Sequence, residues 1–192
     1  MRKYLLHVLI ISVVFLLAPT AHVATYAGEP EDAKEEVRKN PDDALAYFNL
    51  GLAYADLGRY YQAIEPFKQA TRLAPDDAPA HGNLGLTYHK LGKSEEAIKS
   101  YKQTIWIDPD YADAHYGLGN VYFDKGWEKA AIKSYKHVIR IVPDDAWAHY
   151  GLGLCYIRIR DKSSALKQHK ILKKLDTKKA KKLLGMIYTE LD

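Results

Sequence analysis

The sequence is poor in the residues that hold small exported domains together or carry out catalysis. Its 192 residues include a single cysteine, Cys155, so the chain cannot form a disulfide within itself. It also lacks an HExxH zinc motif, a glycine-rich phosphate loop, a GxSxG nucleophile turn and a CxxCH haem attachment sequence. We therefore predict no catalytic residue, no cofactor and no metal site, and we do not expect an enzyme.

Long apolar runs are nearly absent as well. The exception is LLHVLIISVVFLLA at 5–18, whose 14 residues are too few to span a membrane comfortably. A basic start precedes this run, and Pro19 and small residues up to Ala27 follow it, an order typical of a secretory signal. We predict a signal peptide at 1–27 and an exported protein, periplasmic or secreted. The alternative is an uncleaved anchor that holds the protein in the membrane through residues 5–18.

The charges are distributed unevenly along the chain. Residues 28–157 contain 15 basic and 20 acidic side chains, whereas residues 158–192 contain 11 basic and 4 acidic ones. An exported protein with an acidic body is not expected to bind nucleic acid. The lysine-rich stretch 167–182 has two interpretations: a solvated face of a terminal helix, or a weak contact with anionic membrane lipids or an acidic partner.

The remainder of the chain repeats every 34 residues. AHYGLGNVY at 114–122 returns as AHYGLGLCY at 148–156, and the same spacing extends towards the N-terminus. The recurring residues are Leu50, Leu84, Leu118 and Leu152; Gly51, Gly85, Gly119 and Gly153; Tyr54, Tyr88, Tyr122 and Tyr156; Ala63, Ala97, Ala131 and Ala165; and Pro75, Pro109 and Pro143. A period of this length indicates stacked supersecondary units.

Each unit reads as two helices. Leu84 and Tyr88 lie four residues apart on one helical face, and Gly92 suits the left-handed turn that ends a helix. A second amphipathic helix, SEEAIKSYKQTIWI, follows, and Pro109 prevents its continuation. Two helices of this size cannot bury both apolar faces alone, so neighbouring units must stack.

The repeated glycines predict close contacts between the helices. Each lies inside a helix, where glycine costs about 1 kcal/mol relative to alanine. We expect the small alanines and the aromatic slot of the second helix to pack against them. That slot holds Phe67, Tyr101 and Tyr135.

One pattern occurs four times, as LGLAY, LGLTY, LGNVY and LGLCY. Each copy is followed by the alanine and, in most units, by the aromatic residue and the proline. This pattern resembles the tetratricopeptide repeat family over residues 44–179. The resemblance implies an all-α, right-handed superhelical α-solenoid of antiparallel helix pairs. In the last unit Arg160, His169 and Thr177 replace the glycine, the aromatic residue and the proline, as expected of a terminal repeat. The expected units are 44–77, 78–111, 112–145 and a degenerate 146–179, with a short helix and linker at 28–43 and a capping helix at 180–192. Leu183, Leu184, Ile187 and Tyr188 are expected to cover the last unit.

In this family the first helices of successive units line a concave groove that binds extended or helical peptides. The resemblance therefore implies a non-catalytic interaction scaffold or adaptor for a protein or peptide partner, which we place in the assembly of an envelope or exported complex. The alternative is a membrane-tethered structural or accessory subunit. The candidate groove residues, which are largely apolar or aromatic, are Leu45, Phe48, Leu52, Leu86, His89, Tyr116, Asn120, Phe123, Trp147, Tyr150, Leu154, Ile157 and Arg158. Packing between adjacent first helices is the other explanation for these residues.

Two further patterns in the first helices bear on possible binding sites. Some family members clamp a C-terminal carboxylate with lysine and asparagine, but the slot for the leading lysine is held by Phe48, Gly82, Tyr116 and Tyr150, so no clamp is expected. His81, His115 and His149 recur at the repeat spacing. We interpret them as neutral imidazoles filling a bulky slot, because side chains one repeat apart are not expected to converge on one zinc ion.

Overall fold

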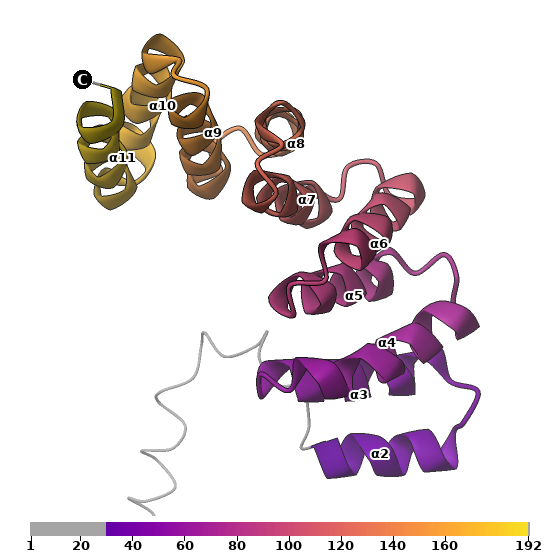
Figure 1. The fold of residues 1–192 in the computed structure, drawn as a ribbon. Helices are drawn as coiled ribbons and strands as arrows, with labels where there is room; N and C mark the ends of the chain where they lie inside the picture. The colour runs from indigo at the N-terminus through magenta and orange to yellow at the C-terminus, as the bar shows by residue number, and fades with distance from the viewer. Residues whose placement is uncertain (1–29, 192) are drawn as a thin grey trace, which may run out of the picture.

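The computed structural model describes residues 30–191, which form ten helices and no strand (Figure 1). The predicted signal or anchor at 1–27 lies outside the described residues. The helices are α2 (Pro30–Lys39), α3 (Ala44–Asp56), α4 (Tyr60–Leu73), α5 (Ala78–Lys90), α6 (Ser94–Ile107), α7 (Ala112–Asp124), α8 (Glu128–Ile141), α9 (Ala146–Arg158), α10 (Lys162–Leu175) and α11 (Thr177–Leu191). Every helix within 30–191 is too short or too polar to cross a membrane.

The 34-residue period sets where the helices begin. The first helices α3, α5, α7 and α9 are each 13 residues long, and the second helices α4, α6, α8 and α10 are each 14 residues long. Each hairpin packs on the next, so that α2 and α11 lie at opposite ends of the array (Figure 1). The predicted all-α solenoid of antiparallel helix pairs is confirmed.

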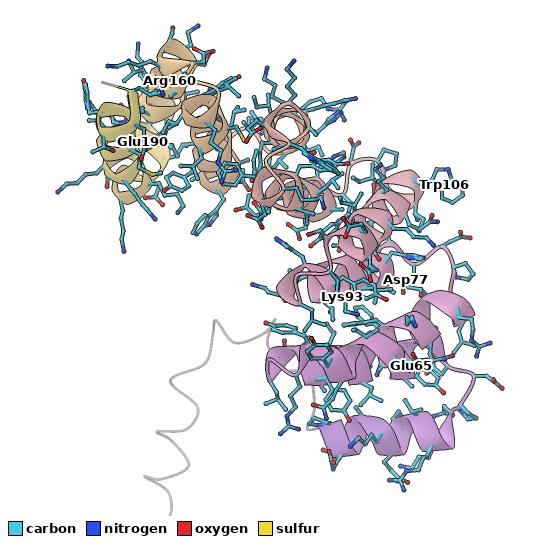
Figure 2. All side chains as sticks on the ribbon, in the orientation of Figure 1. Glu65, Asp77, Lys93, Trp106, Arg160 and Glu190 are labelled. Atoms are coloured by element: carbon cyan, nitrogen blue, oxygen red, sulfur yellow. The ribbon has the colours of Figure 1, made fainter. Side chains whose placement is uncertain are left out.

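A left-handed residue joins the two helices of each unit. Gly58, Gly92 and Gly126 have φ angles of 69°, 71° and 71°. Arg160 adopts the same conformation in the fourth unit, with φ of 59°, at the outer end of the α9–α10 hairpin (Figure 2). A β-carbon in this region costs about 1–2 kcal/mol, so the last unit keeps the turn without the residue that suits it.

The repeated histidines fasten each first helix to the loop before it. The ring nitrogens Nε2 of His81, His115 and His149 donate to the carbonyl oxygens of the closing prolines six residues earlier, at 3.0, 2.9 and 2.8 Å. The imidazoles therefore have a structural partner in the closing loop of the preceding repeat. In the described part of the chain, no three histidine, cysteine, aspartate or glutamate side chains are grouped so that they could hold a metal ion.

Aspartates cap most of the first helices. The side chains of Asp77 and Asp145 accept from the backbone N–H groups of Ala80 and Ala148, at 3.0 and 2.7 Å. The third unit differs, because Tyr111 holds the capping position of α7 and makes no side-chain cap. The turn before α7 is tightened instead by Asp108, whose carboxylate accepts from the N–H of Asp110 at 3.0 Å.

An aromatic ring lies between two glycines at the second and third boundaries between units. Tyr101 packs on Gly85 of its own unit and on Gly117 of the next, where an added β-carbon would lie 2.9 and 2.4 Å from the ring. Tyr135 lies in the same way between Gly119 and Gly151, at 2.8 and 2.7 Å. The close contact predicted for the LG glycines is present. Gly117 and Gly151, which the sequence pattern alone did not single out, make the matching contact across the boundary.

The helix α11 replaces the missing aromatic residue of the last unit. His169 occupies the aromatic slot, and its ring nitrogen donates to the carbonyl of Ala180 at 3.0 Å. Leu183 instead lies over Gly153, with a methyl carbon 2.6 Å from where a β-carbon would stand. Leu183 and Ile187 are completely buried as predicted, but Tyr188 is 52% exposed and packs under the ammonium of Lys162.

Candidate functional site

The predicted groove residues lie on α3, α5, α7 and α9, with very different exposure. Leu45, Leu86, Trp147 and Arg158 are exposed. The half-buried members are Phe48, Leu52, His89, Tyr116, Asn120, Phe123, Tyr150 and Leu154. Ile157 is only 7% exposed and lies in the core cluster that joins α9 to α10 and α11, so its assignment to an open groove is wrong.

Two of the aromatic candidates also have packing partners. The ring of Phe48 lies 5.8 Å from that of Phe67, and the ring of Tyr116 lies 5.8 Å from that of Tyr135, both pairs tilted by 57°. Contacts of this kind stabilise the helix pair from the groove side. Packing therefore accounts for part of the burial of both rings.

A cleft of about 570 Å³ opens between α5 and α7. It brings together four of the predicted residues, Leu86, His89, Tyr116 and Asn120. The remaining lining residues, which were not predicted, are Gly82, Asn83, Lys90, Tyr101, Tyr111, Asp113, Ala114 and Gly117. A signal for some of these was available: Asn83, Leu86 and Lys90 are spaced i, i+3, i+7 on α5, and Asp113, Tyr116 and Asn120 repeat that spacing on α7.

The rim and floor of this cleft are polar at defined points. The ring nitrogen Nε2 of His89 lies 2.9 Å from the carboxylate of Asp124, which ties the ends of α5 and α7 together. Tyr101 forms the floor, since it lines the cleft while only 3% of its surface is exposed. Burial, with Asp113 nearby, raises the pKa of the Tyr101 phenol, so the hydroxyl keeps its proton at neutral pH.

The terminal helix α11 contacts the first helix of the last unit. The ammonium of Lys179 lies 3.7 Å from the centre of the Trp147 ring, and that of Lys182 lies 5.7 Å from the centre of the Tyr150 ring. The Tyr150 hydroxyl donates to the sulfur of Met186 at 3.8 Å. Side chains of α11 therefore contact both of these predicted aromatic residues, although Trp147 remains 58% exposed.

A similar contact closes the interval between α7 and α9. The guanidinium of Arg158 stacks 3.5 Å from the centre of the Phe123 ring and donates to the Phe123 carbonyl. Its Nη1 also lies 3.7 Å from the carboxylate of Glu128. The predicted residues Phe123 and Arg158 thus bind each other.

Comparison with known proteins agrees with this architecture. The chain matches the family described as TPR repeat over residues 51–92, 87–126 and 128–159, and the family described as Tetratricopeptide repeat over residues 32–65. No curated protein sequence matches the chain significantly.

Several solved structures share the fold. A crystal structure of MamA is 30% identical, with a TM-score of 0.75, over 81% of this chain and 91% of that one. MamA from Desulfovibrio magneticus RS-1 is 24% identical, with a TM-score of 0.72, over 78% and 86%. YrrB, described as a TPR protein with an unusual peptide-binding site, is 19% identical, with a TM-score of 0.69, over 82% and 91%. The repeat pattern, the stacked hairpins and the family match together show that this chain belongs to the tetratricopeptide repeat family.

Proposed function

We propose that the protein is a non-catalytic scaffold that binds a peptide segment of a partner protein in the cleft between α5 and α7. The observation that carries this proposal is the cleft itself, which combines an exposed leucine, half-buried aromatic rings and open polar groups on the first-helix face. Apolar side chains with a few placed polar groups are the usual composition of a binding surface. The fold shared with YrrB, which has a peptide-binding site, is consistent with this use.

Leu86 offers a direct test because its side chain is 44% exposed on the rim. Leu86→Arg should abolish retention of the natural partner by the immobilised protein, since it places an unpaired charge in the contact. Leu45→Arg is the matched control, because Leu45 is 61% exposed on α3, outside the cleft. Retention that survives Leu86→Arg, or that is lost equally with both variants, would count against the cleft as the binding site.

The process we propose is the assembly of an exported or envelope complex. This proposal rests on the predicted signal at 1–27, outside the described residues. Intact-mass measurement of the protein from its native source is the test. A mass that corresponds to cleavage near Ala27 supports export as a free protein, whereas an uncleaved mass supports the membrane-tethered alternative.

A second candidate function, an accessory subunit at an anionic membrane surface, is favoured by the charge of the last two helices. Nine lysines lie on α10 and α11, and the only acidic residue there is Glu190. Seven of these lysines are exposed and form no ion pair with another described residue: Lys167, Lys170, Lys173, Lys174, Lys178, Lys181 and Lys182. Sedimentation with vesicles of anionic lipid that weakens as salt rises, with none on neutral vesicles, is the expected result. Salt-independent binding, or none, would exclude it.

A further inference from the structure

The two tyrosines that lie between glycines differ in their hydroxyl groups. The Tyr135 hydroxyl donates to the amide oxygen of Asn120 at 2.7 Å. Position 86 is the equivalent of Asn120 one repeat earlier, and it holds leucine, which cannot accept. The Tyr101 hydroxyl therefore has no hydrogen-bond partner in the described part of the chain, although its residue is almost fully buried.

The glycines around Tyr101 direct this hydroxyl towards the cleft. A β-carbon at Gly117 would stand 2.6 Å from the Tyr101 hydroxyl oxygen, so only glycine lets the hydroxyl pass beneath α7 to the cleft floor. Gly82 also lines the cleft. Buried polar groups are normally paired, so an open hydroxyl at the floor of a cleft is a place for a ligand acceptor.

The two ends of the cleft carry opposite charges. Asp113 lies in the first turn of α7 and Lys90 is the last residue of α5; both are exposed, and neither forms an ion pair with another described residue. Asp124 also lies near the Lys90 end, but its carboxylate is bound to His89 and does not line the cleft. Asp113 at one end and Lys90 at the other are therefore the unpaired charged side chains that line the cleft.

The separation of these charges sets the length of a matching ligand. Because α5 and α7 run in the same direction one repeat apart, Lys90 lies about three helical turns from Asp113 along the helix axis, a distance of roughly 16 Å. An extended chain rises about 3.3 Å per residue, so the end residues of a five-residue segment lie about 13 Å apart on the same face of the segment. The long side chains of lysine and glutamate at these ends cover the few remaining ångströms.

We propose, building on the peptide-binding function above, that the cleft selects an extended segment of about five residues with opposite charges at its two ends. The basic side chain lies at the Asp113 end and the acidic side chain at the Lys90 end. A main-chain carbonyl between them accepts a hydrogen bond from the Tyr101 hydroxyl. Either chain direction satisfies this pattern.

Four pools of blocked pentapeptides test the charge pattern, each with three randomised central positions. The end residues are lysine and glutamate in one order, the same pair in the other order, lysine at both ends, or glutamate at both ends. The immobilised protein should retain both mixed pools about three-fold better than either like-charged pool. Lys90→Glu should shift the preference to the pool with two lysines, and Asp113→Lys should shift it to the pool with two glutamates.

The hydroxyl is tested by Tyr101→Phe, which keeps the ring between its glycines. Retention of the mixed pools should fall about five-fold, the loss expected for one hydrogen bond. The melting temperature should not fall, because no bond within the protein is lost. Tyr135→Phe is the contrast, since it removes the bond to Asn120 and should lower the melting temperature.

The outcomes separate this inference from the function on which it rests. If the pools bind without preference for end charge, or if Tyr101→Phe binds them as the wild type does, the inference is wrong and the peptide-binding cleft is unaffected. If no pool is retained, the inference is also wrong, and the Leu86→Arg comparison decides separately whether the cleft binds the partner.

Discussion

Gly151→Ala should destabilise the array, although alanine is the better helix former. Gly151 lies inside α9, where its β-carbon would stand 2.7 Å from Cζ of Tyr135 in the preceding unit. The ring cannot retreat, because it rests on Gly119 on its other side, where a β-carbon would stand only 2.8 Å away. The new methyl group must therefore push the third and fourth units apart.

The expected magnitude follows from two opposing terms. Overpacking a close contact costs about 1–3 kcal/mol, whereas replacing a helical glycine by alanine stabilises by up to about 1 kcal/mol. A net loss of about 1–2 kcal/mol is expected, which lowers the melting temperature of a domain of this size by roughly 2–8 °C. Gly185→Ala in α11 is the matched control, because nothing lies within 4 Å of its would-be β-carbon. Gly185→Ala should raise the melting temperature by a few degrees, whereas Gly151→Ala should lower it.

Thermal and urea unfolding followed by circular dichroism would measure both variants. Tyr135→Leu supplies the decisive background, since Leu183 already fills the corresponding place over Gly153 in the last unit. In that background Gly151→Ala should cost at least about 1 kcal/mol less than in the wild type. A Gly151→Ala variant as stable as Gly185→Ala, or one with the same cost in both backgrounds, would refute the claim that the ring and the glycine are in tight contact.

Three further experiments test the fold. Arg160→Gly should stabilise the protein by roughly 1 kcal/mol in urea unfolding, because glycine adopts the left-handed conformation without the steric strain of a β-carbon. An unchanged urea midpoint would mean that the turn is not strained. Cys155 is completely buried and its pKa is raised to about 12 by burial, so a thiol reagent at pH 8 should label it only after unfolding, and rapid labelling of the folded protein would contradict its packing. Burial and the neighbouring His115 lower the pKa of His137 in the folded state, so the unfolded chain binds the proton more tightly and stability falls as pH drops below about 6.5. His137→Gln introduces the glutamine that the preceding repeat has at the equivalent position, Gln103. It should therefore reduce the difference in melting temperature between pH 7 and pH 5. An unchanged difference would mean that other groups cause the loss of stability at low pH.

The helical framework could be predicted because the same residue types mark each unit. The LG pair, the tyrosine after it and the closing proline recur in sequence, and each acts on neighbours that are close along the chain. Even the degenerate unit follows the pattern, since Arg160 takes the conformation of the glycines that it replaces. The contact of Gly117 with Tyr101 was missed because it crosses a boundary between units, where the period alone does not indicate which side chain fills the space.

The candidate site was predicted only in part. Leu86, His89, Tyr116 and Asn120 line the cleft as first-helix residues outside the shared core slots. Tyr101 was assigned to the core, and its ring is indeed buried. Its hydroxyl nevertheless reaches the cleft, which depends on the missing side chain at Gly117 and on leucine at position 86.

The sequence by itself determined the length, order and pairing of the helices, because those depend on apolar periodicity and on turn residues that act over a few positions. Only the tertiary structure decided which part of the first-helix face remains open. Tyr150 has the composition of a binding residue, but Lys182 and Met186 contact it from more than thirty residues further along the chain and leave it half-buried. Exposure depends on neighbours that are distant in sequence, and a local repeat pattern carries no information about them.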